Sequence, residues 1–208
     1  MSNHKCEHEH DHSHDEPQSG FEQTLYPYID TTKIVCLNEH VPQAGKSIIK
    51  PYDQRLTSEP YLESAVDEEL ILQIPFTVSV NIKSIVVIGA DEESCPSRVK
   101  LFKNRDGVDF GNADELVAEQ SFDLALDRRG ELDLMVRPSK FQNVNQLTLY
   151  FPSNHSDGEQ QTRITYVGIK GTSTTYRRGV VENAVYESKP QLADHTVKAE
   201  TTPTMRFE

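Results

Sequence analysis

The most distinctive chemistry in this sequence lies near its start, where possible metal ligands alternate with acidic residues. The ligands are Cys6, His8, His10, His12 and His14. Neutral imidazoles and a thiolate on a flexible chain can bind a borderline cation such as Zn²⁺, and flanking carboxylates add attraction. Structural zinc sites instead space their ligands on folded turns, which this stretch lacks. We therefore expect either a metal site or a solvated tail that binds zinc adventitiously, and no resident cofactor.

Side chains for catalysis are scarce in the rest of the chain. Beyond residue 17 the only histidines are His40, His155 and His195, and neither Gly-x-Ser-x-Gly nor a Gly-rich phosphate loop occurs. The carboxylates at 67–69 and in 104–109 do not follow the pattern of an acid–base pair or an EF-hand loop, and we interpret them as turns. Cys36 and Cys95 fit buried or partly buried small hydrophobic residues. We expect no enzymatic activity.

The charge of the chain argues against nucleic acid as a partner. Its 208 residues include 33 acidic and 21 basic side chains, for a formal charge of −12. Binding a phosphate backbone needs clustered Lys and Arg, but the only adjacent basic pairs are Arg128-Arg129 and Arg177-Arg178. The longest apolar run, 85–90, is far shorter than the about 18 residues of a membrane span. We expect no membrane association.

The cysteines and the N-terminal stretch indicate the cellular compartment of the protein. The first twenty residues contain no apolar segment of the kind found in a secretory signal. Three cysteines far apart in the sequence suit reduced thiols rather than a disulfide framework. We therefore expect a cytoplasmic and nuclear protein.

The elements that must position these residues are short β-strands. From Phe21 onwards, short apolar segments alternate with Pro, Gly, Asn and Asp, and hardly any segment has helical periodicity. The turns Asp106-Gly107 and Arg129-Gly130 favour antiparallel connections. The predicted strands are 34–37, 47–50, 61–64, 70–74, 81–88, 99–103, 119–122, 131–136, 146–151, 163–170 and 183–187. This pattern predicts an all-β fold, an antiparallel sandwich or barrel of the jelly-roll kind.

Finer expectations concern burial and helix. In 146–151, Leu147, Leu149 and Phe151 point to one face and Gln146, Thr148 and Tyr150 to the other, the half-buried arrangement of a sandwich strand. The one short helix predicted is 112–118, with Asn112 as its cap. The isoleucines expected in the core are Ile71, Ile82 and Ile88.

Five strings in order along the chain resemble the PITH domain, whose name stands for proteasome-interacting thioredoxin. They are Cys36-Leu37-Asn38-Glu39, the segment 61–76, Val99-Lys100-Leu101-Phe102-Lys103-Asn104, Lys140-Phe141-Gln142-Asn143-Val144 and the segment 162–171. The resemblance implies a jelly-roll β-sandwich similar to galactose-binding and discoidin-like domains. It also implies docking on the proteasome regulatory particle. The chain lacks the thioredoxin half and any Cys-x-x-Cys, so it resembles the free-standing branch of the family and disulfide exchange does not carry over.

These observations predict a disordered tail at 1–19, a PITH domain at 20–195 and a C-terminal tail at 196–208. The expected function is non-enzymatic binding, by a monomer, of the regulatory particle or of ubiquitin-pathway proteins. Two alternatives stay open: a regulator of gene expression independent of the proteasome, and a sandwich that binds a metal or small ligand. The expected partner-binding residues lie in a stretch too polar for core: Tyr186, Glu187, Asp194 and His195. The same stretch also fits a final edge strand and its exit loop.

Overall fold

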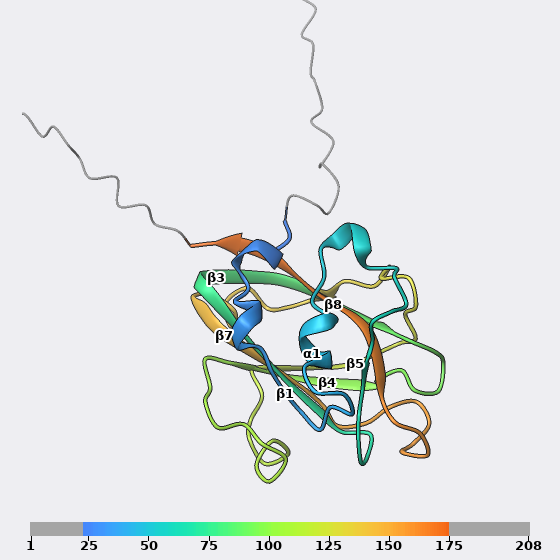
Figure 1. Cartoon of the computed structure of the whole chain (residues 1–208). Coiled ribbons are helices and arrows are strands. Elements are labelled where there is room, and N and C mark those ends of the chain that lie inside the picture. Colours follow the sequence, from blue (N-terminus) through green and yellow to red (C-terminus); the bar gives the residue numbers. More distant parts are fainter. Residues whose placement is uncertain (1–22, 175–208) are drawn as a thin grey trace, which may run out of the picture. The chain divides into compact units, whose positions relative to one another are not determined.

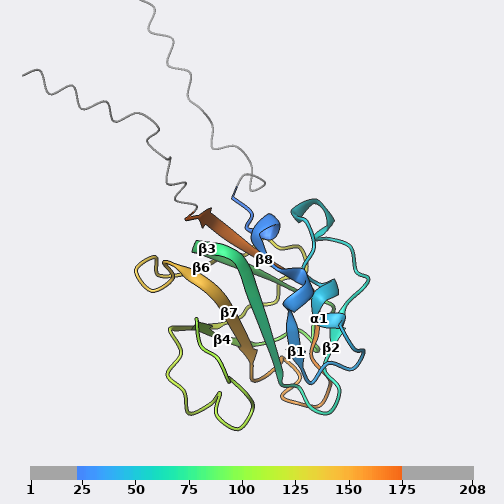
Figure 2. The same cartoon turned by 60° about the vertical axis from the view of Figure 1, so that its left-hand side comes forward.

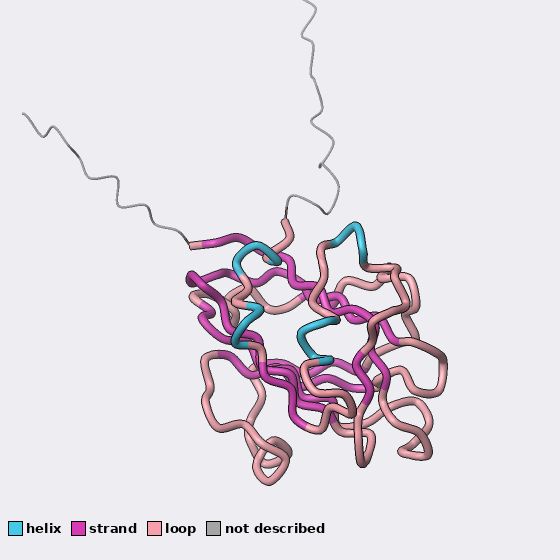
Figure 3. Tube along the Cα trace, viewed as in Figure 1, coloured by secondary structure: helices cyan, strands magenta, loops and turns pink. Residues whose placement is uncertain are grey.

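The computed structural model describes residues 23–174, which form antiparallel strands and a few short helical turns (Figures 1 and 3). The strands are β1 (Val35–Leu37), β2 (Leu62–Glu63), β3 (Leu70–Gly89), β4 (Arg98–Lys103), β5 (Gln120–Asp123), β6 (Leu134–Met135), β7 (Val144–Phe151) and β8 (Arg163–Ser173). The helical turns are η1 (Tyr26–Tyr28), η2 (Thr31–Lys33), α1 (Ala44–Ser47) and η3 (Tyr52–Gln54). The predicted all-β jelly-roll sandwich is confirmed.

All strand pairs are antiparallel, and the long strand β3 belongs to both layers of the sandwich. The strand order is β2-β8-β3-β7-β4-β5, with β1 and β6 also paired to β3. The first part of β3 pairs with β1 and β7, and its second part pairs with β6 and β8. Figure 2 shows the bend of this strand between its two partners. The register with β7 shifts between Pro75 and Val80, where proline supplies no N–H for a ladder hydrogen bond.

The main core lies between the two layers, and each layer also buries part of its outer face. Alternate residues of β3, such as Leu72 and Val87, point into the main core. The outer face of β3, β7 and β4 buries Ile71, Tyr150 and Phe102 with residues of the loop 104–119. On the second layer, Val86, Ile88 and Tyr166 form a small outer cluster. The predicted burial of Ile71, Ile82 and Ile88 is confirmed.

A loop covers the outer face of β7, so the prediction for the burial of this strand is wrong. The strand at 146–151 was expected to be buried on one face only, but Thr148 and Tyr150 on the other face of β7 are also fully buried. Val108 and Ala113 of the 104–119 loop pack against Tyr150. Because a long loop covers this face, alternation within the strand does not identify an exposed side.

Two predicted elements are absent from the described residues. The predicted strand at 47–50 is instead the end of α1 followed by an irregular stretch, in which the consecutive residues Ile48 and Ile49 are both buried. The predicted helix at 112–118 is a series of turns. Its first turn is closed by reciprocal hydrogen bonds: the Asn112 N–H donates to the Asp109 carboxylate, and the Asp109 N–H donates to the Asn112 side chain.

Most of the remaining strand predictions are confirmed, with shifted ends. The predictions 70–74 and 81–88 are parts of one continuous strand, β3. The prediction 131–136 is longer than the observed β6, which has two residues. The prediction 183–187 lies outside the described residues.

Candidate functional site: a groove beside α1

A groove of about 650 Å³ lies between α1 and the segment that leads into β2. Its two walls come from segments about twenty residues apart in the sequence, 40–47 and 59–63. The lining residues are His40, Val41, Pro42, Gln43, Ala44, Ser47, Glu59, Pro60, Tyr61 and Glu63. We call this hollow the α1 groove.

The wall formed by α1 is held in place by Glu39. Its carboxylate oxygens accept hydrogen bonds from the N–H groups of Gln43, at 2.6 Å, and Gly45, at 2.9 Å. Both groups are at the start of α1, where backbone N–H groups lack partners within the helix. A β-carbon at Gly45 would lie 2.5 Å from the Cys36 Cβ atom, so only glycine lets α1 approach β1 this closely.

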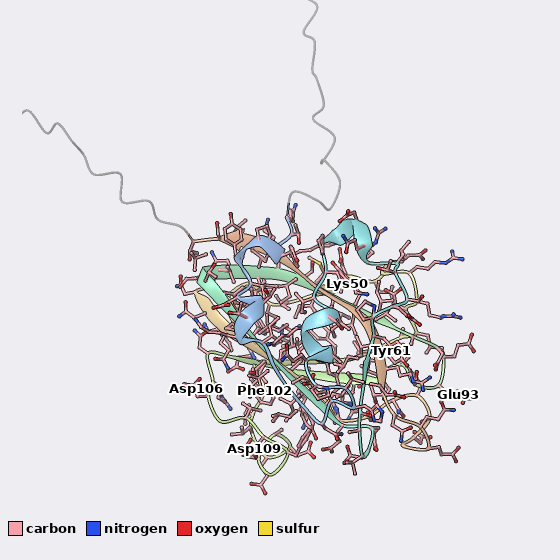
Figure 4. The ribbon with its side chains drawn as sticks, in the orientation of Figure 1. Lys50, Tyr61, Glu93, Phe102, Asp106 and Asp109 are labelled. Carbon is pink, nitrogen blue, oxygen red and sulfur yellow. The ribbon has the colours of Figure 1, made fainter. Side chains whose placement is uncertain are left out.

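The opposite wall is held by the buried side chain of Lys50. Its ammonium group donates to the carbonyl oxygens of Thr57, at 3.2 Å, and Pro60, at 2.9 Å. Burial lowers the pKa of Lys50 below its usual value. In Figure 4 the labelled Lys50 lies above α1, and Tyr61 lies to the right of it. The lysine therefore fixes the loop from which the Tyr61 ring projects.

Main-chain contacts join the two walls at the base of the groove. The His40 N–H donates to the Glu63 carbonyl oxygen at 2.8 Å, and Glu39 forms a β-bridge with Ser64. The Glu63 carboxylate also accepts from Arg163 of β8 at 2.7 Å, which raises the pKa of the guanidinium. The groove is thus tied to the second layer of the sandwich.

Apolar side chains are exposed at both rims of the groove, and a carboxylate lies at one of them. Val41 is 59% exposed on one rim and Tyr61 is 38% exposed on the other. Glu59, at the second rim, is exposed and forms no salt bridge with any residue from 23 to 174. Exposed apolar side chains on a rigid frame, next to a carboxylate, suit the binding of a partner segment with apolar and basic residues.

The arrangement offers little for nucleophilic chemistry. Cys36 lies behind α1, and burial together with the neighbouring Glu39 carboxylate raises the pKa of its thiol. His155 contacts the Leu124 carbonyl oxygen through its ring at 3.0 Å and does not line the groove. Binding is the chemistry that this geometry supports.

The structure brings together three of the five strings that carried the family resemblance. Asn38, with φ +66°, donates its side-chain amide to the Asp67 carboxylate at 2.6 Å and to the Glu69 carbonyl oxygen at 2.8 Å. Thr162 donates its hydroxyl to the Glu68 carbonyl oxygen at 2.6 Å. The strings 36–39, 61–76 and 162–171 therefore contact one another, next to the segments that line the α1 groove.

The other two strings, 99–104 and 140–144, contact each other at the N-terminal end of β7. The Asn104 side chain accepts hydrogen bonds from the N–H groups of Asn145 and Gln146 and donates to the Asn143 carbonyl oxygen. Lys103 donates to the Gln142 carbonyl oxygen at 2.9 Å. Residues 67–69 and 104–109, which we interpreted as turns, lie in the irregular segments that precede β3 and follow β4.

The site residues predicted from the sequence lie outside the described residues. This applies to the metal ligands Cys6, His8, His10, His12 and His14 and to the partner-binding residues Tyr186, Glu187, Asp194 and His195. Both predictions stay predictions. Within residues 23–174, no group of three or more His, Cys, Asp or Glu side chains is arranged to hold a metal ion. No helix in this part of the chain has the length and apolar character needed to cross a bilayer.

Sequence reasoning missed the α1 groove as a site. Tyr61 belongs to a family-like string, but nothing in the sequence pairs it with Val41. The available signal was the proline at each wall, Pro42 and Pro60, since prolines at exposed turns fix the backbone around a binding surface.

Comparisons with known proteins identify related sequences. A family model described as "PITH domain" matches residues 15–190. "PITH domain-containing protein 1" of Dictyostelium discoideum is 43% identical over 176 residues, which cover 85% of this chain and 86% of that protein. The human "PITH domain-containing protein 1" is 36% identical over 195 residues, which cover 93% of this chain and 90% of that protein.

Solved structures support the fold alone. The CBM32-1 and CBM32-2 domains of Clostridium perfringens ZmpB, in complex with GalNAc, match 73% of this chain and 36% of theirs, with a TM-score of 0.53 and 12% identity. The C-terminal domain of a Bacteroides fragilis chitobiase matches 68% of this chain and 93% of its own, with a TM-score of 0.50 and 15% identity. Both likenesses agree with a discoidin-like sandwich.

Proposed function

Given that the chain belongs to the PITH domain family, we propose that it is a non-catalytic protein-binding module. Its partner is the proteasome regulatory particle or a protein of the ubiquitin pathway, in the cytoplasm and nucleus. The observation that carries the proposal is the α1 groove, where Val41 and Tyr61 are exposed on walls held by Glu39 and Lys50.

Rigid walls favour recognition because little conformational entropy is lost when a partner binds. Anchors at the centre of protein interfaces are often aromatic, and Tyr61 supplies one beside Glu59. A partner segment with an apolar residue flanked by Lys or Arg would match this surface in shape and charge. The proteasome is proposed as the partner because the family resemblance implies it.

The matched pair of exposed valines, Val41 in the groove and Val117 in the 104–119 loop, provides a direct test. Full-length tagged chains carrying Val41→Asp or Val117→Asp are used to recover the regulatory particle from cells in the presence of ATP. Val117 is 82% exposed, so both changes place the same charge at the surface. We expect Val41→Asp to reduce recovery about tenfold and Val117→Asp to leave it unchanged.

Melting temperatures of the two variants serve as the folding control, and we expect both to match the wild-type chain. Recovery of the regulatory particle no better than with an unrelated acidic sandwich domain would overturn the choice of partner. Equal recovery with Val41→Asp and Val117→Asp would overturn the choice of surface. A thermal shift with galactose or GalNAc that is lost in Tyr61→Ala would favour a small-ligand platform instead.

A further inference from the structure

A second cavity, of about 500 Å³, lies between the turn at η3 and the turn at 128–131, and it differs from the α1 groove in charge. In Figure 1 the η3 turn is at the top of the coloured part of the chain, in the colour of residues near 50. Three cationic residues line the cavity, Arg55, Arg129 and Lys170, against two carboxylates, Glu131 and Asp133. Three positive charges less two negative ones leave +1, on a chain whose formal charge is −12. We call this cavity the arginine cleft.

The turn that carries Arg129 is held firmly by a buried carboxylate. One oxygen of Asp127 accepts hydrogen bonds from the N–H groups of Arg129, Gly130 and Glu131 at 2.7–3.3 Å, and the other accepts from Leu132 at 2.9 Å. Gly130 has φ +68°, which glycine adopts without strain. The Arg129 side chain, 81% exposed, therefore projects from a fixed backbone.

At least one N–H donor of the Arg55 guanidinium makes no hydrogen bond to the described residues. Its guanidinium lies 4.2 Å from the centre of the Tyr52 ring, and Nη1 donates to the Tyr52 carbonyl oxygen at 3.3 Å. Its Nε atom is buried and has no hydrogen-bond partner among residues 23–174. No carboxylate in this part of the chain lies within salt-bridge distance of Arg55.

The other charges leave Arg55 and Arg129 as the available cations. Lys170 is already neutralised, because both Asp133 oxygens lie 2.9 Å from its ammonium group. Arg129 lies 3.8 Å from Glu131, and both side chains are mostly exposed, so this pair is weak. Planar guanidinium groups with free donors bind carboxylates and phosphates strongly.

The cleft also has an apolar side. Leu56, 59% exposed, lines it beside Arg55. The Tyr52 ring already lies near two cations, Arg55 and, at 5.4 Å, Lys170, so it is a poor stacking surface for a sugar. An anionic group joined to an apolar group matches this lining better than a free phosphate does, because free phosphate would leave Leu56 uncovered.

We propose that the arginine cleft binds a short acidic segment of a protein partner, with a carboxylate on Arg55 and Arg129 and an aliphatic or aromatic side chain against Leu56. The proposal rests on the proposed role in protein binding, but it does not depend on the proteasome or on the α1 groove. It gives the module two docking surfaces of opposite character, one for a basic and apolar segment and one for an acidic and apolar segment.

The test uses the full-length chain and a fluorescein-labelled peptide, Glu-Asp-Leu-Phe-Asp-Glu, followed by fluorescence anisotropy. The control peptide replaces each acid by its amide, Gln-Asn-Leu-Phe-Asn-Gln. We expect Arg55→Gln and Arg129→Gln each to weaken binding of the acidic peptide roughly tenfold, since each removes a charge-assisted hydrogen bond. Arg98→Gln removes the same charge at an exposed residue paired with Asp123, and we expect a change of less than about twofold.

Several outcomes would overturn the proposal. These are equal binding of the two peptides, equal effects of Arg129→Gln and Arg98→Gln, or inorganic phosphate binding while the acidic peptide does not. Arg129 is largely exposed, so its variant stays informative even where Arg55→Gln lowers the melting temperature. Val117→Asp, at an exposed residue that lines neither cavity, serves as a further control, and we expect it to leave peptide binding unchanged. Failure to recover the regulatory particle would count against the proposed partner and leave the peptide result standing.

Discussion

Cys36 and Cys95 are thiols that the fold makes poor nucleophiles. Burial is the main cause that raises the pKa of each thiol, and the carboxylates of Glu39 and Asp91 add to the rise at Cys36 and Cys95 respectively. Since the thiolate is the reactive form, a raised pKa lowers the reactive fraction at any given pH. The environment of both cysteines therefore agrees with a structural role.

We predict slow alkylation of these two cysteines in the folded protein. In a Cys6→Ser chain at pH 8, iodoacetamide should modify them at least about tenfold more slowly in buffer than in 6 M guanidinium chloride, because folding reduces both exposure and thiolate content. Mass spectrometry of the alkylated peptides gives the rate at each site. A folded-state rate at Cys36 equal to the unfolded rate would contradict the assignment of this thiol as partly buried and inert.

Glu69 couples stability to pH. Burial raises the pKa of its carboxyl group, the Asp67 and Asp114 carboxylates raise it further, and the Tyr150 hydroxyl, which donates at 3.0 Å, opposes the rise. The folded state therefore binds the Glu69 proton more tightly than the unfolded state does. Its contribution to stability is fully present below the unfolded pKa, about 4.3, and is lost as pH rises through the folded pKa.

We predict that Glu69→Gln raises the free energy of unfolding at pH 7.5, by less than about 1 kcal/mol at this partly exposed position, because it removes the ionised form. The amide oxygen can still accept the Tyr150 hydroxyl. Urea unfolding should show that the gain shrinks as pH is lowered from 7.5 towards 4.5, because a growing fraction of the wild-type carboxyl is then protonated. Glu159→Gln makes the same charge change at an exposed residue. A gain from Glu159→Gln as large as that from Glu69→Gln would point to net charge instead.

At the scale of elements, Asn38 joins the end of β1 to the turn that precedes β3. Its side chain makes three hydrogen bonds to this turn: to the Asp67 carboxylate, to the Glu69 carbonyl oxygen and from the Val66 N–H at 3.2 Å. Its φ of +66° is in the left-handed region, which asparagine tolerates better than most residues.

We predict that Asn38→Ala lowers the free energy of unfolding by about 2 kcal/mol, since it leaves polar groups of the turn without partners and strains the backbone. Urea denaturation measures this loss. Asn38→Gly removes the same hydrogen bonds but relieves the backbone strain, so it should lose less than Asn38→Ala. The role assigned to Asn38 would be wrong if Asn38→Ala unfolded at the wild-type urea midpoint.

The elements also show which features a sequence can reveal in this fold. Alternation located β7 and most of β8 because it is a local property of the chain. It did not show that Tyr150 would be buried, because the residues that cover it, Val108 and Ala113, are about forty positions away. Helix α1 was missed because its start depends on a hydrogen bond from the Gly45 N–H to the Glu39 carboxylate, which no local pattern reveals. The consecutive buried isoleucines at 48–49 were mistaken for part of a strand.

The α1 groove was missed for a related reason. It exists because the His40 N–H meets the Glu63 carbonyl oxygen, a contact between segments that no local pattern pairs. The family-like strings did include Asn38 and Asp67, which contact each other, although they did not show a hollow nearby.

For the whole domain, the consequential feature is that β3 belongs to both layers. Its 20 residues pair with β7 through Leu70–Pro75 and Val80, and with β8 through Val80–Gly89. Side chains of both parts of β3 also fill the same main core. Neither layer can lose its pairing with β3 without exposing the apolar face of the other, so the two layers should unfold together.

We predict that destabilising one layer lowers hydrogen-exchange protection equally in the other. Leu101→Ala on β4 should cost about 2–5 kcal/mol, and Ile169→Val on β8 about 0.5–1.5 kcal/mol, as buried residues of the main core. With Leu101→Ala, the slowest-exchanging amides of β8 should lose the same free energy of opening as those of β7. With Ile169→Val, the slowest amides of β7 should lose as much as those of β8. Protection lost only within the mutated layer would show that the layers open independently, and would contradict the inference that β3 makes them one cooperative unit.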